Sequence, residues 1–248
     1  MARNGTSGPV VAVGVPSVGN PSWVFVESLM RLRAPGGSYH LLRAGPLAID
    51  VARNELVRQF LATTCEWLLM VDSDAQFEPE TLARLLSWEQ PVVGALAFSR
   101  YGPCMPTIYR GRDPEREGSW RIVQEDVEAW LERYPAMATS QAHVLQPRPF
   151  DALTPVDRSG CHCVLVRRDV LEAIPAPWFT GDPEQRHNKE DIYFFEQVER
   201  AGFPAYVDRS CMVAHLYGER PLAARDWMTW REMFRPIGEV GDPGELAG

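Results

Sequence analysis

Lysine is almost absent from this sequence. Lys189 is the only lysine among 25 basic residues, so arginine supplies nearly every positive side chain. The 33 acidic residues outnumber the basic ones, and the formal net charge is −8. A protein with this charge presents no broad cationic field to nucleic acid or to an anionic membrane. Binding of an anionic ligand would therefore depend on a local group of arginines.

The chain also lacks a long apolar run and an even set of cysteines. No cationic start is followed by a long apolar stretch, so we expect neither a signal peptide nor a membrane-spanning helix. The cysteines are scattered through a chain too large to need disulfides for stability, and we interpret them as reduced thiols of a cytoplasmic protein. The five cysteines are Cys65, Cys104, Cys161, Cys163 and Cys211.

The most informative stretch is EWLLMVDSDAQF at residues 66–77. Its apolar part, Trp67 to Val71, has the length of a buried strand and is too short for a core helix. Asp72 and Asp74 follow it and share one face if the strand continues. Ligands of open α/β sheets bind at the carboxyl ends of strands. Because two carboxylates beside an apolar core repel each other, the pattern predicts a divalent ion such as Mg²⁺ or Mn²⁺ at this edge.

Other interpretations of this motif exist. Two solvated turn residues after a strand would give the same pattern. A calcium-binding EF-hand loop is excluded because Phe77 and Ala83 stand where it needs Gly and Glu. A phosphatase of the haloacid dehalogenase type, with Asp72 as nucleophile, remains an alternative. It is the weaker one, because such enzymes carry Thr or Val where this chain has Gln76 and place the motif after their first strand.

The periodicity of apolar residues predicts strands and helices that alternate along one α/β domain. An irregular stretch at 136–157 interrupts the pattern, and such insertions often serve as lids or partner-binding loops. The predicted strands are 9–15, 39–43, 67–71, 91–98, 119–123, 160–167 and 204–207. The predicted helices are 21–33, 49–63, 79–88, 125–134, 168–174, 189–201 and 222–234.

Two further turns carry polar residues near the expected sheet edge. The first strand ends at Pro16 and Ser17, which would suit a nucleotide base and ribose, although any strand-to-helix turn looks similar. Asp50 is a predicted N-cap, and it places Arg53 and Asn54 in the first turn of the next helix. An exposed arginine on an amphipathic helix explains Arg53 equally well.

Glu190 and Asp191 begin the predicted helix at 189–201. The positive end of the helix dipole stabilises carboxylates there by about 0.3–1 kcal/mol, which alone would explain them. Alternatively, one of them is a general base within hydrogen-bond reach of a substrate hydroxyl.

Two other stretches contain histidine without a clear ligand pattern. His215 by itself is more often a core or surface imidazole than a metal ligand. The triplet Cys161-His162-Cys163 suggests zinc, but no second ligand pair lies at a finger-like spacing. We interpret the triplet as alternation on a buried strand.

Taken in order along the chain, these elements resemble nucleotide-sugar glycosyltransferases of the GT-A fold, particularly the large inverting family that includes cellulose and hyaluronan synthases. The resemblance runs from about Val10 to Tyr217, and no individual motif is specific. Its elements are Pro16-Ser17, Arg53-Asn54, VDSD at 71–74, SGCHCVLVRR at 159–168, KEDIYFF at 189–195 and VAHLYG at 213–218.

The resemblance implies a single GT-A (Rossmann-like) catalytic domain over residues 1–248. Its sheet would be mixed and mostly parallel, flanked by helices, with an irregular insertion on the acceptor side. Residues 9–98 would bind the nucleotide sugar, residues 99–218 would bind the acceptor, and residues 219–248 would form a C-terminal helix and tail.

The resemblance also implies roles for individual residues. A Mn²⁺ or Mg²⁺ ion and a UDP-sugar or GDP-sugar donor are the implied cofactor and substrate. The metal contacts would be Asp72, Asp74 and His215. The base would be Asp191, with Glu190 as an acceptor contact. The donor contacts would be Pro16, Ser17, Arg53, Asn54, Asp72 and Ser73, while Arg100 is a further candidate for phosphate or base.

This chain departs from the processive members of that family. Their QxxRW motif is missing, since DWMTWRE at 226–232 has a different pattern. We therefore predict an enzyme that adds one sugar at a time to a hydroxyl acceptor. The acceptor could be a glycan, a small molecule, a protein or a hydroxylated DNA base. Retention of the anomeric configuration stays open, because retaining enzymes share the DxD motif.

Two alternatives from other classes also stay open: a sugar nucleotidyltransferase and a non-catalytic module that binds a sugar nucleotide. The C-terminal residues Ala223, Trp227, Trp230 and Phe234 stand at helical spacing. They predict a packing stripe, or else a contact in a homo-oligomer.

Overall fold

A computed structural model describes residues 10–17, 19–100, 104–112, 120–122, 124–135, 149–181 and 190–233. The strands of its central sheet are β1 (Val11–Pro16), β2 (His40–Ala44), β3 (Trp67–Val71), β5 (Val92–Leu96), β8 (Leu153–Val156), β10 (Cys163–Arg167) and β11 (Ala205–Met212). The shorter strands are β4 (Ala75–Gln76), β6 (Ile108–Arg112), β7 (Trp120–Ile122), β9 (Arg158–Ser159), β12 (Ala214–Tyr217) and β13 (Arg220–Leu222). The helices are α1 (Trp23–Arg31), α2 (Ile49–Leu61), α3 (Thr81–Leu86), α4 (Gln124–Arg133), α6 (Arg168–Ala173), α7 (Glu190–Arg200) and α8 (Ala224–Met233).

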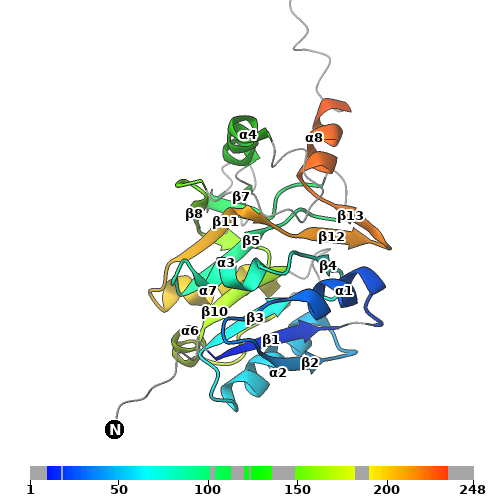
Figure 1. Ribbon diagram of the computed structural model, residues 1–248. Coiled ribbons are helices and arrows are strands. Elements are labelled where there is room, and N and C mark those ends of the chain that lie inside the picture. Colours follow the sequence, from blue (N-terminus) through cyan, green and yellow to red (C-terminus); the bar gives the residue numbers. More distant parts are fainter. Residues whose placement is uncertain are drawn as a thin grey trace, which may run out of the picture.

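The central sheet has seven strands in the order β2-β1-β3-β10-β5-β11-β8 (Figure 1). Parallel pairs join β1 to β2 and β3, and β5 to β11. Strand β10 runs antiparallel to both of its neighbours, β3 and β5, and β8 runs antiparallel to β11. Strands β2, β1, β3, β5 and β11 therefore share one direction. The predicted α/β class with a mixed, mostly parallel sheet is confirmed.

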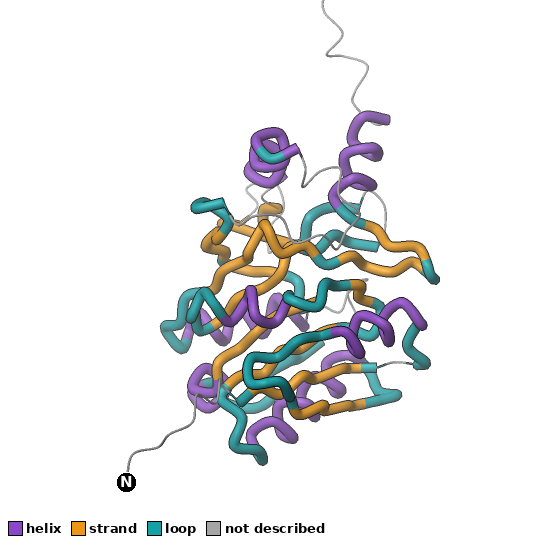
Figure 2. Tube along the Cα trace, in the orientation of Figure 1, coloured by secondary structure: helices purple, strands orange, loops and turns teal. Residues whose placement is uncertain are grey.

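Alternate residues of the central strands face opposite layers of helices. In β3, Leu69 and Val71 pack in the apolar cluster that contains residues of α1 and α3. Leu68 and Met70 pack in the cluster that contains residues of α2, α6 and α7. Both faces of the sheet are thus covered, which explains why these strands are nearly continuous apolar runs. Figure 2 shows the strands in the middle of the molecule with helices outside them.

Two small sheets lie beside the central one, with the orders β13-β12-β4 and β7-β6-β9. In the first, β12 pairs antiparallel with β4, which directly follows the DxD motif. This pairing carries a C-terminal segment to the end of β3. No helix in the described ranges is long and apolar enough to cross a membrane. All five cysteines are free and buried.

Several element boundaries differ from the prediction. Ala48, rather than Asp50, is the N-cap of α2, and it makes no side-chain capping bond. Asp50 lies inside the first turn, where its carboxylate accepts a hydrogen bond from the backbone N–H of Gly181 at 3.3 Å. Strand β10 begins at Cys163, later than predicted. Strand β8 lies in the stretch predicted to be irregular, of which residues 136–148 are outside the described ranges.

Strand β11 is longer than predicted because polar residues are accommodated inside it. Its pairing with β5 shifts register between Asp208 and Met212, as at a β-bulge. The buried Asp208 carboxylate accepts hydrogen bonds from the backbone N–H and the hydroxyl of Ser210 and from the Trp88 indole N–H. The polar residues 208–210, which in the sequence resemble the end of a strand, are therefore part of the sheet.

The C-terminal stripe packs against the core. Trp227 is buried in α8, and its ring lies 5.9 Å from the ring of Phe98. Trp230 is partly buried against the same cluster, and Phe234 is outside the described residues. A homo-oligomer formed through this helix stays a prediction.

Gly45 has a backbone conformation that permits no side chain. Its φ is +142°, and a Cβ there would lie 1.8 Å from the carbonyl oxygen of Ser17. We expect Gly45→Ala to lower the free energy of unfolding by about 2 kcal/mol or more, because the chain would have to move or strain. Urea unfolding measures this. Gly19→Ala is the control, since a Cβ there meets nothing within 4 Å. Equal stability of the two variants would contradict the prediction.

Candidate metal centre and active site

The two aspartates of the DxD motif converge through a turn. Strand β3 ends at Val71, and the backbone N–H of Ala75 donates to the carbonyl of Asp72 at 3.1 Å. The prediction of an extended strand through both aspartates is therefore wrong in detail. Their carboxylates still reach one place, because Asp72 continues the alternation of Leu68 and Met70 and the turn brings Asp74 back beside it.

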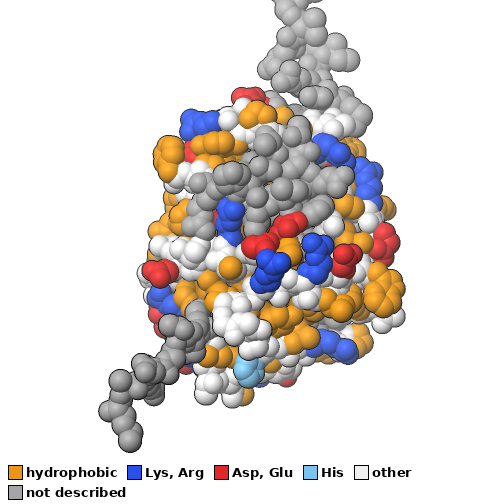
Figure 3. Space-filling model, in the orientation of Figure 1, with side chains coloured by type: hydrophobic (Ala, Val, Ile, Leu, Met, Phe, Trp, Pro, Cys, Tyr) orange, Lys and Arg blue, Asp and Glu red, His pale blue; other side chains and the backbone are white. Residues whose placement is uncertain are grey.

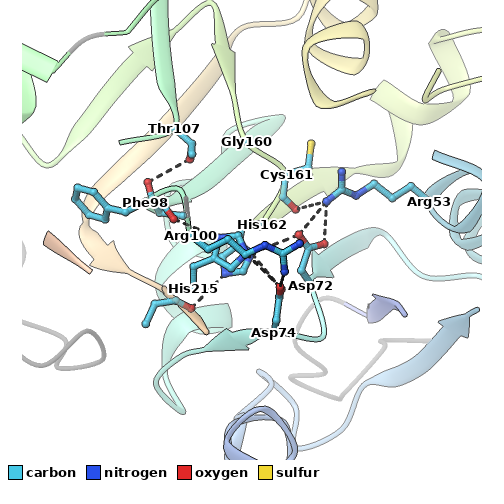
Figure 4. A network of polar contacts seen from close by, with 12 residues as sticks. Arg53, Asp72, Asp74, Phe98, Arg100, Thr107, Gly160, Cys161, His162 and His215 are labelled. Carbon is cyan, nitrogen blue, oxygen red and sulfur yellow. Dashed lines mark hydrogen bonds and ion pairs between the residues drawn. The ribbon is translucent and has the colours of Figure 1, made fainter. Parts of the chain in front are cut away.

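Two strands bring histidines to this turn. The antiparallel pairing of β10 with β3 places His162 opposite Asp72, whose backbone N–H donates to the His162 carbonyl at 3.0 Å. The pairing of β12 with β4 places His215 opposite Ala75. The two imidazole rings stack with their centroids 4.1 Å apart and an angle of 26° between the planes. Figure 4 shows both rings directed at the aspartates.

His215 has an oxygen acceptor at each ring nitrogen. Its Nδ1 lies 3.2 Å from the carbonyl oxygen of Phe98, and its Nε2 lies 3.2 Å from Oδ2 of Asp74. A neutral imidazole carries only one N–H, so one lone pair must face an oxygen. Burial and the neighbouring His162 lower the pKa of His215, which keeps the ring neutral. A cation between Nε2 and the Asp74 carboxylate would remove this conflict.

His162 also lies between two acceptors. Its Nε2 is 3.2 Å from the carbonyl oxygen of Ala214, and its Nδ1 is 3.3 Å from Oδ2 of Asp72. Burial lowers the pKa of His162, but the hydrogen bond and the charge of Asp72 raise it by more, so the pKa lies above its usual value. The ring can therefore hold a proton when no metal is bound. Metal binding at Nδ1 would release that proton.

Asp74, His162 and His215 have the geometry of a metal-ligand group. Each offers one ligand atom, and these atoms lie within 4.8 Å of one another. The distance between His215 Nε2 and Asp74 Oδ2 is 3.2 Å. In an octahedral site with ligands about 2.1 Å from the ion, neighbouring ligand atoms lie about 3.0 Å apart, so the observed distance is close to that of two ligands of one ion. Two imidazoles with one carboxylate suit Mn²⁺ or another transition metal better than Mg²⁺, which prefers oxygen ligands.

Asp72 is held by a buried arginine. The Nη2 of Arg53 lies 2.8 and 3.1 Å from the two carboxylate oxygens of Asp72, and its Nη1 is hydrogen bonded to Glu190. The Arg53 side chain is 3% exposed. Burial raises the pKa of Asp72, but the charge of Arg53 and the hydrogen bond of His162 outweigh it, so the pKa lies below its usual value. The structure thus gives Arg53 two carboxylate partners.

Asp191 follows Glu190 in the first turn of α7. Burial and then the Glu190 carboxylate raise the pKa of Asp191 to about 7, against the opposing charge of Arg53. On β6, Tyr109 has its pKa raised to about 12 by burial and then by the charge of Asp191. A carboxyl group with a pKa near 7 is suited to accept a proton at neutral pH.

Arg100 lies on the other side of the metal-ligand group, just after β5. Its Nη1 is 2.6 Å from Oδ2 of Asp74, and its side chain is 40% exposed. Burial raises the pKa of Asp74, but the hydrogen bond of His215 and the charges of His162 and Arg100 lower it well below its usual value. In Figure 4, Arg53 approaches Asp72 and Arg100 approaches Asp74.

A pocket of about 260 Å³ adjoins the DxD turn. Its walls are mainly apolar and come from the ends of β1 and β2 and from α1, including Phe25, Leu29 and Leu41. Ser17 and Ser73 line its polar side. Because Ser73 stands between the two aspartates, the pocket opens beside the metal-ligand group. Pockets for drug-sized ligands begin at about 300 Å³, so this one fits part of a ligand, such as a planar base.

Asn54 has a different set of partners from those predicted. Its amide nitrogen donates to the carbonyls of Asp50 and Phe179, and its oxygen accepts from the backbone N–H groups of Trp178 and Phe179. Both aromatic rings are buried, and Phe179 stacks on Phe194 with the centroids 4.7 Å apart. Asn54 therefore holds the 178–179 segment in place.

Comparison with known proteins shows the fold. No family model matches the sequence, and no curated protein matches it. The chain is similar to the crystal structure of A197 from STIV, with 18% identity over 87% of this chain and 90% of that chain, and a TM-score of 0.54. At this identity the two chains share a fold and nothing more is shown.

The structure brings most of the predicted site residues to one edge of the sheet: Ser17, Arg53, Asp72, Ser73, Asp74, Glu190, Asp191 and His215. Pro16 ends β1 next to Ser17. His162 also lies at this edge, although the sequence pattern indicates only a residue of a buried strand. The antiparallel register of β10 against β3 is the signal that would have identified it, and that register joins segments far apart in the chain.

Removing Arg53 should destabilise the protein strongly. Arg53→Met would leave Asp72 and Glu190 without their shared cation, and breaking a buried ion pair in this way costs about 3–5 kcal/mol of unfolding free energy. Arg58→Met in the same helix is the matched control. Arg58 is 58% exposed and pairs with Glu55, so its loss should cost less than about 1 kcal/mol. Denaturant unfolding of both variants measures the difference, and similar losses would contradict the expectation.

Proposed function

We propose that this protein is a metal-dependent glycosyltransferase that transfers one sugar from a nucleoside-diphosphate sugar to a hydroxyl acceptor. The observation that carries the proposal is the position of the Asp74, His162 and His215 group. It adjoins, through Ser73, an apolar pocket lined by Ser17 and Ser73, and Asp72 and Arg53 link it to Glu190 at the acidic start of α7. A donor nucleotide and an acceptor would need two such sites beside one cation.

The donor side has the composition that a nucleotide diphosphate requires. The apolar walls of the pocket would take the base, and Ser17 and Ser73 offer hydroxyls to the ribose. The diphosphate would then lie over the metal-ligand group. When bound, the metal ion neutralises the charge that develops on the leaving diphosphate. Comparison of UDP with GDP in the binding experiment below distinguishes a UDP-sugar donor from a GDP-sugar donor.

The acceptor side offers a base. In an inverting transfer, a bond forms between the acceptor oxygen and the anomeric carbon as the bond from that carbon to the diphosphate breaks. The hydroxyl proton goes to Asp191, whose pKa of about 7 lets it accept a proton at neutral pH. Glu190, whose carboxylate is bonded to Arg53, would contact the acceptor.

The phosphatase alternative is less consistent with the geometry. In such an enzyme Asp72 would attack phosphorus, yet Arg53 binds both oxygens of Asp72 and His162 lies 3.3 Å from one of them. These contacts lower the pKa and the nucleophilicity of the carboxylate. A nucleotidyltransferase and a non-catalytic binding module would use the same pocket, so activity must separate them from a glycosyltransferase.

Binding of a nucleoside diphosphate should require the metal group. We expect UDP or GDP with Mn²⁺ at about 100 times its Kd to stabilise the protein by about 2.7 kcal/mol. For a chain of this size that corresponds to a rise in Tm of about 5–10 °C. Asp74→Asn should abolish the shift, while Asp169→Asn, which removes a half-exposed partner of Arg167, should keep it. The absence of a shift in the wild type with every nucleoside diphosphate would contradict the proposal.

Turnover should depend on Asp191 in its ionised form. We expect kcat/KM to rise with pH through about 7 and then level off, because the protonated carboxyl cannot accept a proton. Asp191→Asn should lower kcat by about 10²–10⁴-fold and retain the nucleotide-dependent Tm shift. The folded-state pKa of Asp191 is raised from 3.8 to about 7, so its contribution to stability falls as the pH rises between these values, and the loss is complete above pH 7. Asp191→Asn should therefore be more stable than the wild type at pH 8, and full activity in this variant would contradict the role.

A further inference from the structure

The position of Arg100 suggests a function beyond pairing with Asp74. Its Nη1 and the Nε2 of His215 contact the same carboxylate oxygen, Asp74 Oδ2, at 2.6 and 3.2 Å. A carboxylate oxygen offers two lone-pair sites. Arg100 thus uses one site, while the other faces the histidine where a metal ion would bind.

A metal ion at that site would compete with Arg100 for Asp74. The guanidinium and the ion would then be adjacent positive charges on one oxygen, which is unfavourable. The Arg100 side chain is 40% exposed, so it can leave without breaking a packed core. Arg53, by contrast, is 3% exposed and held by two carboxylates, so it cannot take part in such an exchange.

We propose that Arg100 occupies Asp74 in the ligand-free protein and binds the diphosphate of the donor once metal and donor are bound. The inference rests on the proposed function for the identity of the anion. A diphosphate bound to the metal brings new anionic oxygens to the side of Asp74 that Arg100 faces. The planar guanidinium matches phosphate oxygens in bidentate geometry. Arg100 therefore makes binding of the metal and binding of the diphosphate cooperative.

The charge of the surroundings favours this exchange. Arg53 already offsets Asp72 and Glu190, because it is ion-paired with both carboxylates. Arg100 is the cation that reaches Asp74 from the exposed side. Figure 3 shows acidic and basic side chains interleaved near the middle of one face of the molecule. In the proposed exchange the guanidinium stays beside anionic groups, first the Asp74 carboxylate and then the diphosphate.

The test measures Mn²⁺ alone and inorganic pyrophosphate with saturating Mn²⁺, each by isothermal titration calorimetry. We expect Arg100→Gln to bind Mn²⁺ alone about 3–10-fold more tightly, because a competing cation is gone. The same variant should bind pyrophosphate with Mn²⁺ about 10-fold more weakly, because a charge-assisted contact is lost. Arg100→Lys should bind Mn²⁺ as the wild type does and pyrophosphate a few-fold more weakly.

Opposite signs in the two titrations are the result that supports the proposal. A loss of affinity in both would make Arg100 a support of Asp74, and no change in either would make it an ordinary surface ion pair. Tighter metal binding without weaker pyrophosphate binding would make it a competitor only. Each of these three results overturns the proposal. Arg33→Gln is the control, since Arg33 is 73% exposed, pairs with Glu80 at 2.7 Å and should change neither titration.

Pyrophosphate separates this inference from the proposed function. If the wild type binds pyrophosphate with Mn²⁺ but no nucleoside diphosphate, the glycosyltransferase proposal fails while the Arg100 result can still hold. If UDP or GDP binds and Arg100→Gln loses no affinity for either nucleotide or pyrophosphate, the proposed function stands and the Arg100 inference fails. If the wild type binds no pyrophosphate at all, the inference is overturned.

Discussion

The site depends on how four carboxyl groups are held close together at the edge of a buried sheet. Asp72, Asp74, Glu190 and Asp191 come from two segments more than one hundred residues apart. Arg53 bridges Asp72 and Glu190 from within the core, and Arg100 reaches Asp74 from the exposed side. Without these cations the carboxylates would repel one another in a region where burial disfavours the ionised forms of Asp72, Asp74 and Asp191. Arg53 beside Asp72, and the two histidines with Arg100 beside Asp74, hold the pKa of each of these two carboxyls below its usual value.

The apolar runs of the sequence predict the strands of the central sheet other than β8, and the position of the DxD motif. The inner strands β1, β3, β5 and β10 are buried on both faces, so their composition is visible in a short window of sequence. Local pattern could not show that β10 runs antiparallel beside β3, and for this reason His162 was interpreted as a strand residue only. His215 was identified through its order along the chain. Its contact with Asp74 depends on the pairing of β12 with β4, which joins residues about 140 apart.

Arg53 shows the same limit in a different way. The helical period placed it near the sheet edge, where either exposure or a phosphate contact was expected. Its burial and its two carboxylate partners follow from α2 and α7 packing on one face of the sheet. Its Nε has no hydrogen-bond partner among the described residues, although it is buried. An unpaired buried N–H is costly, so the two ion pairs must outweigh that cost.

The role proposed for Asp191 as a base would place stability and function in opposition. A carboxyl whose pKa is raised to about 7 is partly protonated at neutral pH, and its ionised form is disfavoured by burial and by Glu190. An ordinary surface aspartate would carry no such cost, but its pKa would make it a weaker base. Arg53 limits the cost because it neutralises Glu190 while leaving Asp191 without a direct ion pair of its own among the described contacts. One buried arginine thus keeps Asp72 ionised beside the metal group and opposes the rise in the pKa of Asp191, which burial and Glu190 still hold at about 7.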